Sequence, residues 1–143
     1  MLTILALAFL LLAQAPTVPE VTAENAAIAK IGAERNLAAK KKLVLSFEKN
    51  FPKSSRLPEL YMDLSRTLVS NSDLDTARSY AEKAVAVVAK MKTEAAASGD
   101  QTRAQQQWMN SIDTSTKKNL EWVKQMVTWQ QEQVRSTVLR KQR

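Results

Sequence analysis

The sequence predicts an all-α protein made of antiparallel helical hairpins and closed by a long C-terminal helix. Helix breakers are scarce, because the 143 residues include two Gly and four Pro. Apolar residues recur at steps of three and four along most of the chain, as they do on one face of a helix. No stretch alternates apolar and polar residues as a half-buried strand does. Together these observations favour helices throughout residues 23–139.

Residues 1–15 have the features of a secretory signal peptide. An apolar run from Leu2 to Ala13 precedes the small-x-small pattern of a cleavage site, Ala13-Gln14-Ala15. The run of about 12 apolar residues is shorter than the about 20 that span a bilayer. No Lys or Arg precedes it and Pro16 follows the cut, so an uncleaved anchor and an ordinary buried helix stay open. The expected location is the periplasm of a bacterial envelope or the outside of the cell.

The remaining elements follow from turn residues and helix caps. Two prolines in residues 16–22 predict an extended linker, and residues 23–50 form one long helix or two joined near Gly32 and Asn36. A helix over 57–69 and another over 74–97 flank the turn at 70–73, which Asp73 can cap. Gly99 should end the second of these helices, with Asp100 as the next cap. Residues 101–139 are helical, either continuous or interrupted around 110–118, and 140–143 form a basic tail.

Catalysis is disfavoured by composition. The chain contains no Cys and no His, so it lacks a thiolate nucleophile, the commonest general base and the commonest metal ligand. Asp73 and Asp75 lie two residues apart and do not share a helical face. A phosphate-binding loop is excluded because Gly32 and Gly99 are the two glycines present. The sequence therefore predicts no enzyme, no cofactor and no metal site.

Small and large residues between Pro58 and Met91 follow a recognisable spacing. The large residues are Tyr61, Leu64, Leu68 and Leu74, and the small ones that fall between or after them are Ser65, Ala77 and Ala84. This pattern resembles one 34-residue tetratricopeptide repeat, a hairpin of two helices that approach closely where side chains are small. The pattern departs from the family at four positions: Ser65 and Ser72 replace Gly, Ala81 replaces an aromatic residue and Ala89 replaces Pro. Residues 43–55 resemble the end of a preceding repeat, and a generic Ala-rich hairpin is the alternative.

The resemblance implies a binding face and a cap. In this family, partner peptides lie along the first helix of each repeat, which here places Glu59, Met62, Arg66, Val69 and Ser70 at the face. The alternative is that Met62 is a core residue and Arg66 an ordinary surface charge. Because one or two repeats are too few to be stable alone, the C-terminal helical segment must cap the stack. We expect four residues of that segment to act as capping or interface residues: Trp108, Trp122, Met126 and Trp129.

The chain is basic, with a net charge of +7, and much of that charge lies near its end. From Lys117 onward there are seven Lys or Arg and two Glu, a local excess of five positive charges; Lys40–Lys42 form a second cluster. Such a helix could bind an anionic membrane surface. Nucleic acid is disfavoured, because Trp122 and Trp129 share the apolar face with Met126 and do not lie among the basic residues. The function expected first is an exported, non-enzymatic module that presents a rigid helical face to another protein or a second copy. The alternative is membrane association through the C-terminal helix.

Overall fold

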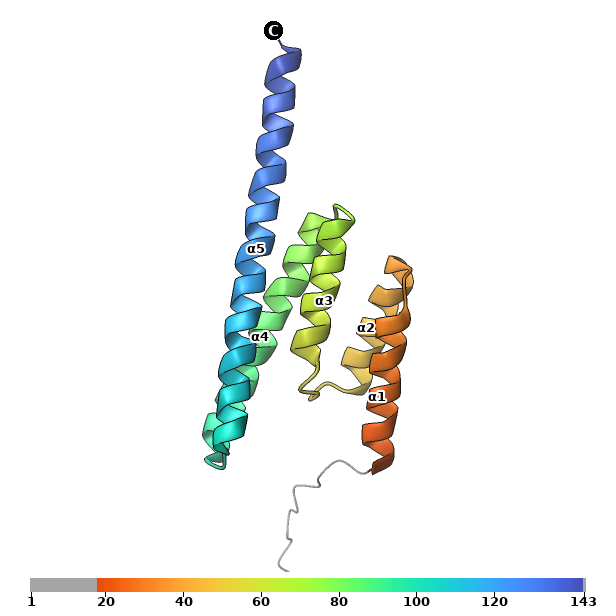
Figure 1. The fold of residues 1–143 in the computed structure, drawn as a ribbon, viewed down its shortest axis with the longest axis vertical. Helices are drawn as coiled ribbons and strands as arrows, with labels where there is room; N and C mark the ends of the chain where they lie inside the picture. Colours follow the sequence, from red (N-terminus) through yellow and green to blue (C-terminus); the bar gives the residue numbers. More distant parts are fainter. Residues whose placement is uncertain (1–17, 143) are drawn as a thin grey trace, which may run out of the picture.

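The computed structural model describes residues 18–142 and contains five consecutive helices in that range, with no strand among them (Figure 1). These are α1 (Val18–Ala33), α2 (Leu37–Asn50), α3 (Leu57–Ser70), α4 (Leu74–Ser98) and α5 (Arg103–Lys141). Neighbouring helices run antiparallel, so α1 with α2 and α3 with α4 form two hairpins, and α5 packs against the second of them. The prediction of an all-α chain with a long C-terminal helix is confirmed. The arrangement is compatible with a helical repeat fold. The predicted signal peptide lies outside the described residues.

The N-terminal part of the chain differs from the predicted boundaries. Helix α1 begins at Val18, so most of the predicted 16–22 linker is helical. A proline in the first turn is tolerated there because the first amide hydrogens of a helix have no partner within it. The open question over residues 23–50 is resolved in favour of two helices, which are separated at Glu34–Asn36. Asn36 caps α2 by accepting a hydrogen bond from the Ala39 amide at 3.0 Å.

The core is centred on the α3–α4 hairpin. Small side chains at the crossing, Ala77, Ala81 and Ala84, are completely buried, and Ser65 of α3 is buried with them. Their size allows the two helix backbones to approach closely, as the sequence pattern predicts. The larger buried side chains around them are Tyr61, Leu64, Leu68, Tyr80 and Val88. Burial of each large apolar side chain contributes about 1.5–3 kcal/mol, so this hairpin carries most of the hydrophobic stabilisation.

The connectors before and after α4 contain the residues that begin α4, end α4 and begin α5. Asp73 occupies the N-cap position of α4, but its side chain makes no capping hydrogen bond and lies 3.8 Å from Lys41 of α2. Gly99 ends α4 with a φ of 67°, as predicted. The predicted cap Asp100 is wrong: Thr102 caps α5, and its side chain and that of Gln105 each bond to the other's backbone amide.

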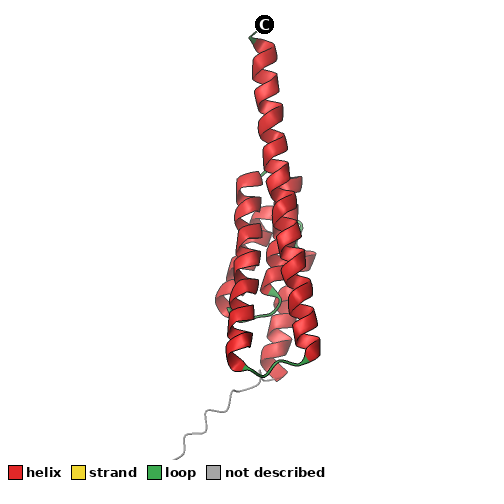
Figure 2. Ribbon diagram, turned by 90° about the vertical axis from the view of Figure 1, so that its left-hand side faces the viewer, coloured by secondary structure: helices red, strands yellow, loops and turns green. Residues whose placement is uncertain are grey.

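Helix α5 is continuous over 39 residues, so the considered interruption around 110–118 does not occur. At 1.5 Å per residue it is about 58 Å long, against about 37 Å for the 25 residues of α4. Its C-terminal part therefore extends beyond the other helices (Figures 1 and 2). The last fully buried residue of α5 is Val123, and Arg140 and Lys141 of the predicted basic tail belong to the helix.

Candidate functional site

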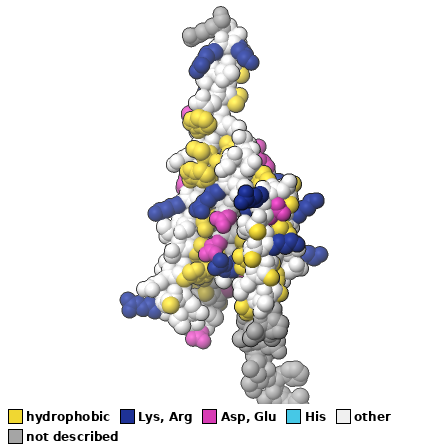
Figure 3. Space-filling model, turned by 45° about the vertical axis from the view of Figure 1, so that its right-hand side comes forward, with side chains coloured by type: hydrophobic (Ala, Val, Ile, Leu, Met, Phe, Trp, Pro, Cys, Tyr) yellow, Lys and Arg dark blue, Asp and Glu magenta, His cyan; other side chains and the backbone are white. Residues whose placement is uncertain are grey.

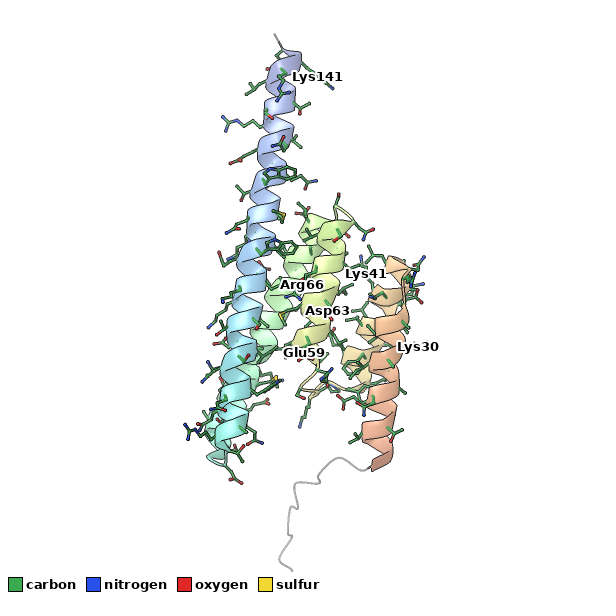
Figure 4. All side chains as sticks on the ribbon, in the orientation of Figure 1. Lys30, Lys41, Glu59, Asp63, Arg66 and Lys141 are labelled. Atoms are coloured by element: carbon green, nitrogen blue, oxygen red, sulfur yellow. The ribbon has the colours of Figure 1, made fainter. Side chains whose placement is uncertain are left out.

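The five residues predicted for partner binding all lie on α3, in different environments. Arg66 and Ser70 are exposed, whereas Glu59 and Val69 are half-buried; Figure 4 shows Glu59, Asp63 and Arg66 along one face of the helix. Glu59 pairs with Arg56 at 3.3 Å, and Val69 packs against the core. Met62 is 6% exposed, because it faces the core. The proposed contact of Met62 with a partner is therefore wrong, and the alternative assignment of Met62 to the core is correct.

A buried polar network joins α3 to α5 next to Met62 and Arg66. The Asn119 side chain, 4% exposed, donates from Nδ2 to Ser65 Oγ at 2.8 Å, and Ser65 Oγ donates to the Met62 carbonyl oxygen at 2.8 Å. Arg66 Nε donates to Asn119 Oδ1 at 3.1 Å, and its Nη1 lies 3.7 Å from Asp63 Oδ1. These contacts fix the orientation of the Arg66 guanidinium group. Asn119 was missed from sequence, although a polar residue beside Leu120 in an apolar stripe was a usable signal.

The surface between α3 and α5 contains two neighbouring hollows. The larger, of about 410 Å³, is lined by Arg66, Ser70, Ser115, Lys118, Asn119 and Trp122. The smaller, of about 100 Å³, lies where the α3–α4 turn meets α5 and is lined by Val69, Ser72, Leu74, Met126, Trp129 and Gln130. We call these twelve residues the α3–α5 face. It includes three of the predicted α3 residues, Arg66, Val69 and Ser70, but neither Glu59 nor Met62.

The tryptophans of α5 differ in burial. Trp108 is half-buried and packs against the core, where it can serve as a capping residue. Trp122 is 39% exposed and Trp129 is 58% exposed, and both line the α3–α5 face. The expectation that they cap the core by burial is therefore wrong. Trp122 faces the larger hollow and not the core, and Trp129 follows Val123, the last fully buried residue of α5. Figure 3 shows hydrophobic side chains exposed along this C-terminal part of the helix. A role for Trp122, Met126 and Trp129 at an interface stays a prediction.

Two further clusters of interacting side chains bind helices to one another. Lys83 of α4 lies over the rings of Tyr61 and Tyr80 and pairs with Glu48 of α2 at 3.3 Å. Burial, followed by the proximity of Glu48, raises the pKa of Tyr61 above its usual value. On the other side of α4, Asp113 of α5 accepts hydrogen bonds from Lys117 at 2.9 Å and Lys92 at 3.0 Å. Both bonds lower the pKa of the Asp113 carboxyl group, and the bond from Lys117 has the larger effect.

Hollows elsewhere on the described surface have mixed linings. One lies between α1, α2 and α3, where Lys40, Arg56, Glu59 and Asp63 line it together with apolar residues. Another lies near the α4–α5 connector and includes Trp108 and Met109. Within residues 18–142, no three acidic side chains gather as a metal site requires. No helix in the described part of the chain is long and apolar enough to cross a membrane.

Comparison of the chain with protein-family models, curated proteins and solved structures finds no match.

Proposed function

We propose that this protein is a non-enzymatic interaction module that presents the α3–α5 face to another polypeptide. The observation that carries the proposal is the exposure of Trp122 beside a hollow of about 410 Å³ and of Trp129 beside the neighbouring hollow of about 100 Å³. Large aromatic side chains on a rigid helix contribute much contact area at little entropic cost, and tryptophan is enriched among residues that dominate binding energy. Both tryptophans lie on one continuous helix held against the core by Ile112, Asn119 and Val123. The face therefore needs little ordering when a partner binds.

The same surface is where a tetratricopeptide-type module would bind, and we propose that classification. In support, two helical hairpins are followed by a helix that begins a third unit, and Ser65, Ala77 and Ala84 are buried at the helix crossing. Helix α3 is the first helix of its hairpin, and Arg66 and Ser70 lie on the side that approaches α5. We further propose that the chain is exported, to the bacterial envelope or beyond the cell, on the basis of the apolar run and cleavage pattern in residues 1–15.

Site-specific photo-crosslinking in the source cells tests this function. A benzophenone amino acid is placed at Ser70 or Gln130 on the α3–α5 face, and at exposed Lys49 of α2 as the matched control. We expect one discrete crosslinked polypeptide from both face positions and none from Lys49. Crosslinks to lipid alone, or polypeptide crosslinks restricted to Lys49, would refute the proposed face.

Association with an anionic membrane surface is the second candidate, and the basic C-terminal segment favours it. From Lys117 onward, seven Lys or Arg oppose two Glu. However, an interfacial helix needs its apolar residues on one side. The exposed Val138 and Leu139 are adjacent and therefore separated by about 100° around the helix. Trp129 and Val134 are five residues apart and therefore separated by about 140°. This spread favours the polypeptide partner. Binding to anionic vesicles that is lost at high salt would instead support the membrane.

A further inference from the structure

We propose that the partner segment bound by the α3–α5 face is acidic and amphipathic, with carboxylates that meet Arg66 and Lys118 and apolar side chains that cover Trp122, Met126 and Trp129. This inference rests on the proposed function and specifies the chemistry of the partner. The occupant is a segment of a different protein.

The charges on the face are of one sign. Arg66 and Lys118 line the larger hollow, and none of the twelve residues of the face is acidic. Lys118 is exposed and has no carboxylate within 4.0 Å among the described residues. Arg66 is bonded through Nε to Asn119, and its Nη1 lies 3.7 Å from Asp63, so within the described part of the chain the guanidinium group donates no hydrogen bond through Nη1 or Nη2. Two cations with unused donors at one hollow are complementary to carboxylates.

The apolar half of the face lies one to three helical turns from these cations. Trp122, Met126 and Trp129 are spaced four and three residues apart, so they follow one side of α5. Lys118 precedes Trp122 by one further turn on that side, and the smaller hollow opens between Met126, Trp129 and the α3–α4 turn. A partner helix with acidic residues at one end and apolar residues at steps of three and four would match this order. The Arg66 guanidinium is already fixed by Asn119, so little side-chain entropy is lost when it pairs.

A second copy of this chain is a poorer occupant. The segment from Lys117 to Arg143 carries seven basic and two acidic residues, so two such segments repel each other when they lie side by side. The whole chain has a net charge of +7 and would be repelled in the same sense.

Selection from a displayed library of random 18-residue peptides, sorted on the full chain, tests the inference. The sequences of the selected peptides are compared with those of the unsorted library. A second sort on the Lys118→Glu and Trp129→Ala variants identifies the peptides whose binding depends on these two side chains. We expect enrichment of Glu and Asp together with apolar residues at steps of three and four. For a representative enriched peptide, each substitution should weaken binding about tenfold or more, since tryptophan anchors and reversed charges have effects of that size. Affinity should also fall as NaCl is raised.

Lys42→Glu is the matched control, because it reverses one exposed charge on α2 that has no ion pair within the described residues. It should change affinity by no more than about twofold. Circular dichroism confirms that each variant is folded; Trp129 and Lys118 are exposed, so their replacement should leave the helices intact.

Three contrary results are distinguishable, and they separate the failure of this inference from the failure of the proposed function. Enriched peptides that depend on Trp129 but carry no excess of acidic residues would overturn the acidic partner and leave the interaction module in place. If no peptide depends on Trp129 or Lys118, and anionic vesicles bind in a Trp129-dependent manner, both proposals are wrong and the membrane is the target. A dimer in sedimentation experiments that Trp129→Ala dissociates would overturn the separate partner in favour of a second copy.

Discussion

Asn119 is a polar side chain in the contact between α3 and α5, where an apolar residue would be expected. It is 4% exposed, and its amide connects Ser65 and Arg66 of α3 through hydrogen bonds of 2.8 and 3.1 Å. No buried side-chain polar atom of the described residues is left without a partner. A fully satisfied network of this kind specifies one register between two helices, because any shift would leave a buried donor unpaired.

We predict that Asn119→Ala lowers the free energy of unfolding by about 1–3 kcal/mol, since Ser65 loses its donor and a small void forms. Urea denaturation measures the change. Exposed Asn110 on the same helix is the matched control, and Asn110→Ala should be within about 0.5 kcal/mol of the wild type. In a double-mutant cycle with Ser65→Ala, the double variant should be destabilised by less than the sum of the two single variants. Strictly additive effects would mean that the two side chains do not act together.

The lowered pKa of Asp113 predicts how the stability of the protein depends on pH. Its bonds to Lys117 and Lys92 hold its pKa below the usual 3.8, so the folded state binds its proton less tightly than the unfolded state. Its contribution to stability is therefore complete above about pH 4 and is lost as pH falls through the lowered pKa. Asp113→Asn should cost about 1 kcal/mol or less at pH 7, because both lysines are largely solvated. Thermal melts from pH 7 to 2 should show the gap from the wild type closing below pH 4. Asp100→Asn in the α4–α5 connector serves as control.

At the scale of the elements, the two turns around α4 differ in how well their residues suit the backbone. Gly99 and Ser72 both have positive φ angles, 67° and 61°. Glycine adopts this region freely, whereas serine is strained by its Cβ. Apart from its two chain neighbours, no described residue has an atom within 4 Å of a Cβ built on Gly99, so the conformational cost alone decides the effect of a substitution there.

Two opposite substitutions test this difference. Ser72→Gly should raise the free energy of unfolding by about 0.5–1 kcal/mol, and Gly99→Ala should lower it by about 1 kcal/mol. Chemical denaturation of both variants measures the changes. Because Ser72 also lines the smaller hollow, the Ser72→Gly variant should be checked for unchanged partner binding. A destabilised Ser72→Gly variant would mean that the serine side chain supports the turn.

Which elements the sequence predicts depends on how local their determinants are. Helices α3 and α4 are predictable because the periodic apolar residues and the turn at 70–73 lie within a few residues of one another. The continuity of α5 is harder to predict from the sequence, since Thr114 and Thr116 are poor helix formers. In the folded protein their hydroxyl groups bond to the carbonyl oxygens of Asn110 and Asp113, so they do not interrupt the helix. The capping box at Thr102 was readable from sequence, but the nearby Asp100 obscured it.

At the scale of the whole molecule, the candidate site depends on quantities that no local pattern encodes. The sequence places Trp108, Trp122 and Trp129 on a helix with wide apolar faces, which favours burial for all three. Their burial is decided by which side of α5 meets α3 and α4 and by where those helices end, and of the three it is the half-buried Trp108 that packs against the core. The pairing of Arg66 with Asn119, 53 residues later, likewise depends on the helix register. The family resemblance placed Arg66, Val69 and Ser70 near the site, whereas its depth and the lining by Lys118 required the packed structure.

The distribution of buried side chains predicts that the molecule does not open uniformly. Helices α3 and α4 contain most of the buried residues, whereas α2 contributes Val44 and Phe47, and Ile31 is the most buried described side chain of α1. The part of α5 beyond Gln130 contributes none among the described residues. Regions with few buried apolar contacts open at lower free energy than the core. We therefore expect amide hydrogens of α1 and of α5 beyond Gln130 to exchange at least about tenfold faster than those in the middle of α3 and α4.

Two core substitutions make this hierarchy testable by hydrogen exchange and mass spectrometry. Phe47 holds α2 against the core, and its ring lies 4.9 Å from that of Phe51, centroid to centroid, with the two planes tilted by 41°. Phe47→Ala should accelerate exchange in α1 and α2 while leaving the middle of α3 and α4 nearly unchanged. Leu68→Ala, in the completely buried centre of α3, should cost about 2–5 kcal/mol and accelerate exchange in every helix. Equal acceleration everywhere by Phe47→Ala would show one cooperative unit. If α1 and α2 open separately, as we expect, the α3–α5 face stays assembled while the N-terminal hairpin opens, because its lining comes from α3, α4 and α5 and from the turn between α3 and α4.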